Sequence, residues 1–338
     1  MLKGVRHNFS VGPPVQGDLF IDRTEIVRNA TELLSSSSGN LLIAGARRVG
    51  KTSLCFKLLD VTAKMKSVLA TYMSMEANYE QSPDRFTQGV LLHTIKSIAH
   101  SLFEKTYSQL LADLGKPPGL DRDYGNLLRL FELARQNSGS VGHSSHKEMG
   151  AALMAHAKLS QEERRELMVG QFSAFEYLSL LDEVVEFLRR HEISRFTLFV
   201  DEANKLTLES NSHIIRENLA LFSSKGLQFC FVTTPEVVAA VPTASELFHH
   251  RIDIGAFDDK QAVSRLIEKC CSVDGVPVGV THLFDAAAID AIWRVSKGLP
   301  FRIQALCQRS LLLAAEKGFN LVNLEAVLEA VSDPEGLL

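Results

Sequence analysis

A glycine-rich segment near residue 45 constrains the fold of this chain more than any other feature. Its sequence, LLIAGARRVGKTS over residues 41–53, contains the pattern G-x-x-x-x-G-K-[ST] from Gly45 to Thr52. An apolar run typical of a buried strand precedes the pattern, and leucines at helical spacing follow it. A strand, a glycine loop and a helix in this order are the setting that a phosphate-binding loop requires.

The chemistry of this segment follows from its geometry. Two glycines let the backbone curl so that successive N–H groups point inward, and the helix that starts there adds the positive end of its dipole. Lys51 is placed to reach the β- and γ-phosphates of a nucleotide, and the Thr52 hydroxyl is placed to ligate Mg²⁺. The predicted phosphate-binding residues are consecutive: Gly45, Ala46, Arg47, Arg48, Val49, Gly50, Lys51, Thr52 and Ser53.

A second motif, FTLFVDEANKL, begins at Phe196 and places two acids after an apolar run. A buried strand would deliver Asp201 to the sheet edge where Mg²⁺ binds. Glu202 is then the predicted general base toward the attacking water, a role that contributes roughly 10²- to 10⁴-fold. The motif is weak alone, but together with the complete phosphate loop it predicts a metal-dependent nucleotide site with Thr52 and Asp201 as metal ligands.

Two further segments refine this prediction. Residues 204–207 read NKLT and resemble the guanine-reading N-K-x-D, but the fourth residue is a threonine without a carboxylate, so adenine is favoured over guanine. Thr234 ends the next apolar strand, where its hydroxyl would contact the γ-phosphate or hold the water. The alternative for Thr234 is a strand-ending turn with Pro235. The predicted ligands are therefore ATP and Mg²⁺.

Composition narrows the class of protein. The net charge of −4 over 338 residues provides no overall basic field that would attract nucleic acid. Five cysteines without a C-x-x-C pattern are typical of buried, reduced thiols in a cytosolic protein. The sequence has neither an 18-residue apolar run nor an apolar signal segment, so we expect a cytoplasmic protein without a membrane partner. His143, His146 and His156 are expected to be solvated.

Strands and helices alternate along the first three quarters of the chain. The predicted strands cover residues 41–44, 67–73, 196–202, 227–235 and 251–254. The predicted helices cover residues 20–34 (with a capping box of Asp22 and Glu25), 84–114, 126–134 and 172–190. This alternation predicts an α/β fold with a parallel sheet and helices on both faces. After Phe257 we expect helices only, over residues 258–271, 284–297, 300–317 and 323–331.

The assembled pieces resemble the AAA+/STAND class of P-loop ATPases, and within it the archaeal-type, origin-recognition-like branch. Over roughly residues 18–75 and 172–331 four segments carry the resemblance: LFIDRTEIV (with Asp22 where the family box has glycine), GARRVGKTSL, FTLFVDEANKL and KGLPFRIQALCQRSL. The second and third, the Walker A and Walker B motifs, are specific for nucleotide binding, whereas the other two are short.

The resemblance implies a P-loop NTPase fold with a five-stranded parallel sheet in the order 5-1-4-3-2 and a C-terminal helical lid. It divides the chain into an N-terminal arm (1–17), an ATPase domain (18–255, with a helical insertion at about 115–170) and a lid domain (256–338). Arg302 of the lid would sense the phosphates as sensor 2, unless it only forms a surface salt bridge. Arg251 would reach the nucleotide of a neighbouring subunit, unless it is an ordinary surface arginine.

Three functions compete at this point. The first is a nucleotide-dependent assembly switch that acts with further copies of the chain or with a partner protein. The second is a DNA-handling ATPase, as in transposition target selection or replication initiation, which needs a basic surface; the candidates for it are Lys57, Lys64, Lys66, Arg164 and Arg165. The third, a small-molecule kinase, needs a different lid. We expect that the part on which the ATPase acts lies in residues 76–170 or on a partner.

Overall fold

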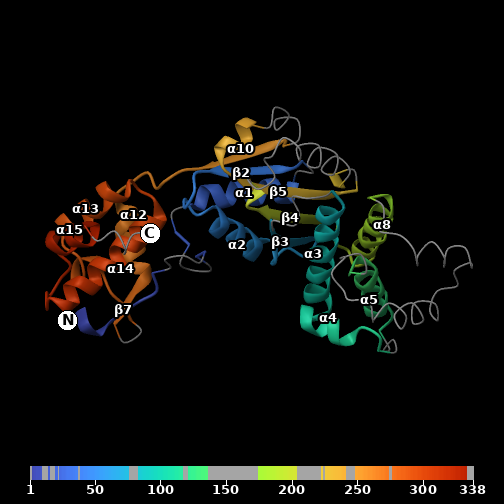
Figure 1. Ribbon diagram of the computed structural model, residues 1–338, viewed down its shortest axis with the longest axis horizontal. Helices are drawn as coiled ribbons and strands as arrows, with labels where there is room; N and C mark the ends of the chain where they lie inside the picture. The colour runs from blue at the N-terminus through green and yellow to red at the C-terminus, as the bar shows by residue number, and fades with distance from the viewer. Residues whose placement is uncertain are drawn as a thin grey trace, which may run out of the picture.

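A five-stranded parallel sheet lies at the centre of the molecule (Figure 1). The computed structural model describes residues 2–9, 14–15, 20–21, 23–36, 39–75, 83–116, 121–135, 174–203, 222–223, 225–240, 248–273 and 276–332. The strands of the sheet are β2 (Leu41–Gly45), β3 (Val68–Ser74), β4 (Arg195–Asp201), β5 (Leu227–Thr233) and β6 (His250–Ile254). Their spatial order is β3-β4-β5-β2-β6, and all the pairings are parallel. Counted along the chain this is the order 5-1-4-3-2, so the predicted topology is confirmed.

One face of the sheet is covered by α1 (Thr24–Ser36) and α2 (Lys51–Thr62). Leu34 of α1 and Leu54 and Leu58 of α2 are fully buried with Leu41 and Ile43 of β2. All residues of β2 and β5 are buried, as expected for central strands that are covered on both faces. This burial explains why β2 is a continuous apolar run and why β5 is apolar except at Gln228 and Thr233.

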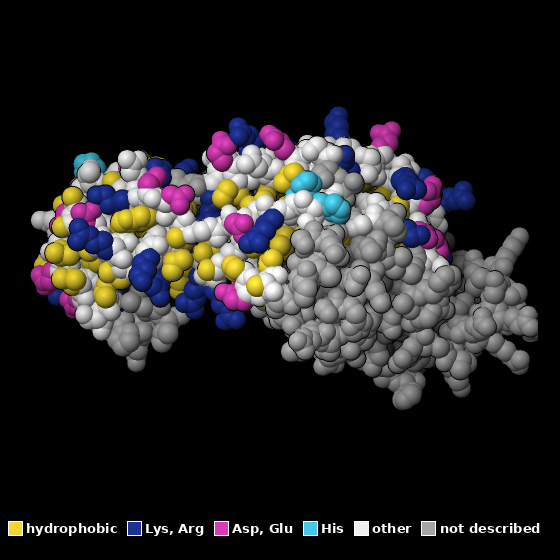
Figure 2. Space-filling model, turned by 90° about the horizontal axis from the view of Figure 1, so that it is seen from above, with side chains coloured by type: hydrophobic (Ala, Val, Ile, Leu, Met, Phe, Trp, Pro, Cys, Tyr) yellow, Lys and Arg dark blue, Asp and Glu magenta, His cyan; other side chains and the backbone are white. Residues whose placement is uncertain are grey.

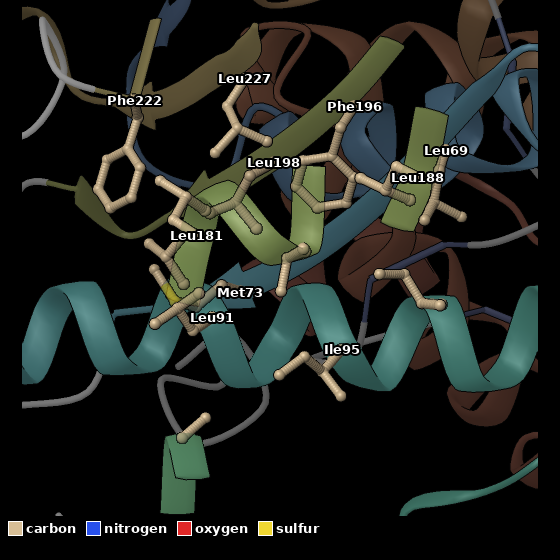
Figure 3. Packing of buried hydrophobic residues seen from close by; sticks show 14 of the residues in the cluster. Leu69, Met73, Leu91, Ile95, Leu181, Leu188, Phe196, Leu198, Phe222 and Leu227 are labelled. Carbon is tan, nitrogen blue, oxygen red and sulfur yellow. The ribbon is translucent and has the colours of Figure 1, made fainter. Parts of the chain in front are cut away.

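The opposite face is covered by α3 (Pro83–Phe103) and α8 (Ala174–Arg190), and α5 (Arg122–Arg135) packs against both helices. Figure 3 shows Leu91 and Ile95 of α3 and Leu181 of α8 in the apolar layer that also contains Leu198 and Phe196 of β4. The described part of the predicted insertion is therefore built onto the core. Residues 136–173, with the three histidines and the two arginines named above, lie outside the described residues, as do Asp22 and residues 204–207.

The predicted helix over residues 84–114 is wrong in one respect, because it is two helices. α3 ends at Phe103 and α4 (Tyr107–Asp113) begins anew. Glu104 between them has a φ of 53°, which a helix cannot contain. Thr106 starts α4 with a capping box. The backbone amide of Gln109 donates to Thr106 Oγ1, and the backbone amide of Thr106 donates to Gln109 Oε1. The T-x-x-Q spacing of residues 106–109 was the sequence signal for this break.

The second lobe contains α12 (Gln261–Cys270), α13 (Ala286–Ser296), α14 (Pro300–Glu316) and α15 (Leu324–Ser332), on the left of Figure 1. The expectation of helices only after Phe257 is wrong. β7 (Cys271–Val273) pairs with β8 (Val276–Pro277) and with β1 (Val5–His7) in an antiparallel sheet. The partner strand of β7 comes from the first residues of the chain, so no local pattern after Phe257 could indicate it.

The N-terminal residues also supply apolar side chains to the second lobe. Leu2, in a short 3-10 helix (Leu2–Gly4), and Phe9 are buried in the same apolar cluster as Leu266, Ile292 and Leu306. All five cysteines are free and buried, as expected. Among the described residues, no helix has the length and apolar character needed to span a membrane.

Candidate nucleotide-binding site

The glycine loop lies at the carboxyl end of β2 and leads directly into α2. A Cβ atom at Gly45 would lie 2.4 Å from the carbonyl oxygen of Ile254, so only glycine fits beside β6. Gly50 has a φ of 93°, a conformation that residues with side chains rarely adopt, and α2 begins at the next residue. Both glycines of the motif are therefore required by the backbone path that opens the helix N-terminus.

The ammonium group of Lys51 lies over this loop. Its Nζ donates to the carbonyl oxygens of Gly45, at 2.8 Å, and Ala46, at 2.7 Å. Burial lowers the pKa of Lys51, while the carboxylates of Asp201 and Glu236 act in the opposite direction. A phosphate group at the start of α2 would offer this cation a charged partner in place of two neutral carbonyls.

The two predicted metal ligands meet at the end of β4. Thr52 Oγ1 donates to Asp201 Oδ2 at 2.6 Å, and Asp201 is buried. Tyr72 of β3 donates its hydroxyl to the same carboxylate oxygen at 3.0 Å. Burial first, and the Asp201 carboxylate second, raise the pKa of Tyr72. A hydroxyl and a carboxylate oxygen side by side are ligands that Mg²⁺ accepts, so the residues fit the metal.

Glu202 follows Asp201 in a left-handed turn with a φ of 56°, and its side chain is exposed. This turn ends β4 and directs the second acid away from the strand. Its backbone amide donates to Asp201 Oδ1 at 2.7 Å, and Ser74 Oγ on β3 lies 3.5 Å from Glu202 Oε2. An exposed carboxylate beside the buried Asp201, the predicted metal ligand, is the arrangement that a general base toward water would need.

Thr234 follows the end of β5, whose Thr233 pairs with Ala44 of β2. A hydrogen bond from the Thr234 side chain is the main cause that lowers the pKa of Glu236, and the Lys51 ammonium acts in the same direction. Thr234 and Lys51 therefore both interact with the carboxylate of Glu236. Glu236, in the first turn of α10 (Pro235–Ala240), belongs to no motif and was missed in the sequence.

A pocket extends from the phosphate loop toward the second lobe. Its lining residues come from the N-terminal segment, the loop with the start of α2, and the second lobe: Pro14, Val15, Phe20, Ile21, Arg23, Arg48, Val49, Gly50, Lys51, Thr52, Ser53, Phe257, Leu266, Pro300, Phe301 and Gln304. The Arg48 guanidinium lies over the Phe301 ring, 4.2 Å from its centroid. The backbone amide of Val15 donates to Ser53 Oγ at 3.0 Å. The apolar and aromatic part of this pocket suits a nucleobase, and its polar part is formed by the phosphate loop.

No known family profile matches the chain, and no curated protein matches it in sequence. Solved structures do match in fold. The Orc1 protein of Aeropyrum pernix, solved in complex with DNA, is 13% identical with a TM-score of 0.54, over 97% of this chain and 69% of that one. A Walker-type ATPase of Pyrococcus abyssi is 15% identical with a TM-score of 0.51, over 100% of this chain and 77% of that one. The chain has the fold of an AAA+ P-loop ATPase.

Arg23 connects several parts of this AAA+ fold. It is buried, and its Nη2 donates to the carbonyl oxygens of Val49, at 2.7 Å, and Gly255, at 2.9 Å. Its guanidinium also lies 5.5 Å from the centroid of the Phe257 ring. Arg23 therefore joins the segment before α1 to the phosphate loop and to the segment that leads into the second lobe. The sequence contained it only as part of the LFIDRTEIV box.

The two arginines outside the main motifs are placed differently from the residues of the phosphate loop. Arg302 is exposed on α14 and is not among the residues that line the pocket, whereas Gln304 is. Arg251 is exposed on β6, an edge strand, and forms a 2.7 Å ion pair with Asp253. Their roles as sensor 2 and as a residue acting on a neighbouring subunit stay predictions.

Proposed function

We propose that this chain binds ATP with Mg²⁺ at the loop from Gly45 to Ser53 and hydrolyses it. The observation that carries the proposal is the 2.6 Å contact between Thr52 Oγ1 and Asp201 Oδ2. These residues belong to two motifs far apart in the sequence, and the fold brings them together at the start of α2 and the end of β4. Nothing in ordinary packing requires a buried carboxylate at this point.

Each residue has a distinct task in this proposal. The loop amides and Lys51 bind and orient the phosphates, and Thr52 with Asp201 would hold the metal. Mg²⁺, when bound, supplies positive charge that neutralises the phosphate oxygens. Glu202 accepts the proton of the attacking water. Phe301 and Pro300 of the lid cover the nucleobase side and exclude water from it.

The nucleotide site is tested by ATP affinity with and without Mg²⁺. We expect binding that depends on Mg²⁺ in the unaltered chain and is lost in Lys51→Ala, because the phosphate charge is then poorly balanced at the helix end. Lys57→Ala, on the same helix but outside the loop, is the matched control and should bind normally. Unchanged ATP affinity in a folded Lys51→Ala chain would overturn the assignment.

We further propose that the ATP cycle serves as an assembly switch with a protein partner or with further copies of the chain. The support is the composition of the pocket, whose walls come from both lobes, so that nucleotide binding and lid position depend on each other. The test is the mass of the assembly in solution with ATP, ADP and no nucleotide. A mass that is the same in all three states would contradict the switch.

The alternative is a DNA-handling ATPase, and one observation favours it, because the Orc1 neighbour was solved on DNA. Against it stand the net charge of −4 and the surface in Figure 2, where acidic and basic side chains are interspersed over the described part of that face. A DNA shift assay over a range of salt concentrations decides between the two, since phosphate contacts weaken steeply with salt. DNA binding that weakens with salt, and that is lost when Lys64 and Lys66 are replaced by glutamate, would support the DNA function.

A further inference from the structure

Strand β3 is an edge of the central sheet, and a groove runs along its outer side. One wall is the C-terminal part of α2 with the turn at Lys66, and the other wall is a face of α3. The groove has a volume of about 660 Å³ and lies apart from the nucleotide pocket, with which it shares no lining residue. An edge strand beside an open groove is a surface on which a further strand can pair.

The backbone of β3 is oriented for such pairing. Arg195 N donates to Ser67 O at 3.1 Å and Met75 N donates to Asp201 O at 3.0 Å, so the odd-numbered residues of β3 direct their polar groups toward β4. Because this direction alternates along a strand, Val68, Ala70 and Tyr72 direct theirs to the outer side, where Tyr72 already forms a backbone hydrogen bond with His93. The Val68 amide donates back to Met65 O at 3.4 Å. The Val68 carbonyl and both polar groups of Ala70 therefore face the groove.

The walls of the groove carry two lysines and several hydroxyl groups. Four lining residues of α3 recur at helical spacing on one face: Lys96, Ser97, His100 and Ser101. His93 lies on the same face, but burial lowers its pKa to about 4, so it carries no charge at neutral pH. Lys66 contributes a second, exposed ammonium group from the opposite wall. Asp60 is the one acidic residue that lines the groove in the described part of the chain. Leu59, Leu69 and Ile193 give it an apolar base.

We propose that this groove binds an extended, acidic segment of a partner protein, which adds to β3 as a further strand. The strand edge supplies main-chain hydrogen bonds, and the basic walls select acidic side chains. A peptide fits better than a nucleic acid, because backbone groups at strand spacing on β3 match the amide and carbonyl spacing of another polypeptide. The site does not depend on the nucleotide function proposed above.

The first test measures the charge requirement. A fluorescein-labelled peptide of alternating Glu and Val, seven residues long, is titrated with the full chain without nucleotide, and its anisotropy is followed. We expect saturable binding that falls roughly tenfold in Lys66→Glu and Lys96→Glu, a change of about 1.4 kcal/mol. Lys269→Glu, an exposed site on α12, is the matched control and should bind as the unaltered chain does. A Lys/Val peptide that binds equally well would overturn the proposal.

The second test measures the backbone requirement and needs no protein variant. Two isomers of the Glu/Val peptide carry N-methyl groups on alternate amides, one isomer on the odd positions and the other on the even positions. Only one set of amides faces β3 in an added strand, so one isomer should lose binding by roughly tenfold or more while the other keeps it. Equal binding of both isomers, or displacement of the peptide by a single-stranded oligonucleotide at equal charge, would overturn the proposal.

Discussion

Arg23 holds the phosphate loop against the segment that leads into the lid, and its removal tests how much the site depends on that contact. In Arg23→Ala the carbonyl oxygens of Val49 and Gly255 lose a charged donor at 2.7 and 2.9 Å in a site where Arg23 is only 7% exposed. A hydrogen bond to a charged group contributes about 1.5–3 kcal/mol. Because one nitrogen makes both bonds, we expect the free energy of unfolding to fall by about 3 kcal/mol in total.

The measurement is urea unfolding, followed by circular dichroism and by the fluorescence of the single tryptophan, Trp293, in the lid. Arg28→Ala is the matched control, because Arg28 lies on the following helix in an exposed ion pair with Glu25, which contributes at most about 1 kcal/mol. ATP affinity should fall in Arg23→Ala only, since Val49 belongs to the loop. If Arg23→Ala loses no more stability than Arg28→Ala, the reasoning is refuted.

Three further predictions concern the site and the core. Glu202→Gln should bind ATP normally and hydrolyse it slowly, because an amide cannot accept the proton; unaltered turnover would exclude Glu202 as the base. Burial lowers the pKa of His93 to about 4, below the ordinary value near 6.5, so stability should fall as the pH falls through that interval. The free energy of unfolding should be about 2 kcal/mol lower at pH 5 than at pH 7. Urea unfolding of His93→Gln should not show this decrease. Mixing Arg251→Ala with Lys51→Ala protein should restore some ATPase activity if Arg251 acts between subunits, whereas Arg302→Ala mixed the same way should not; an absence of recovery in both mixtures would remove Arg251 from the site.

Much of the core could be predicted from the sequence because its signals are local. The glycines at 45 and 50 are required by a tight backbone path, and the central strands are apolar runs because both their faces are covered. The pairing of β1 with β7 could not be predicted, since it joins residues that are far apart in the chain and have no shared pattern. The break before α4 had a local signal, the capping box of Thr106, and only the long apolar periodicity hid it.

The residues of the candidate site also fall into two groups, those that the sequence predicted and those that it did not. Lys51, Thr52 and Asp201 lie in motifs, and the sequence predicted that they meet. Tyr72 reaches Asp201 because β3 and β4 pair in a register that sets Ser74 beside Asp201, and a register is a property of the folded sheet. Glu236 reaches the neighbourhood of Lys51 only through the order of β5 and β2. Residues recruited by neighbouring strands carry no pattern of their own.

The pairing of β1 with β7 has a mechanical consequence. The polypeptide crosses between the lobes twice, once between Phe9 and α1 and once between β6 and α12. Because two chain segments connect the lobes, the second lobe can move relative to the sheet only in ways that both segments allow. The first crossing includes Pro14 and Val15, which form part of the pocket wall. Any displacement of the second lobe relative to the sheet would therefore change the pocket wall against which a nucleotide would rest.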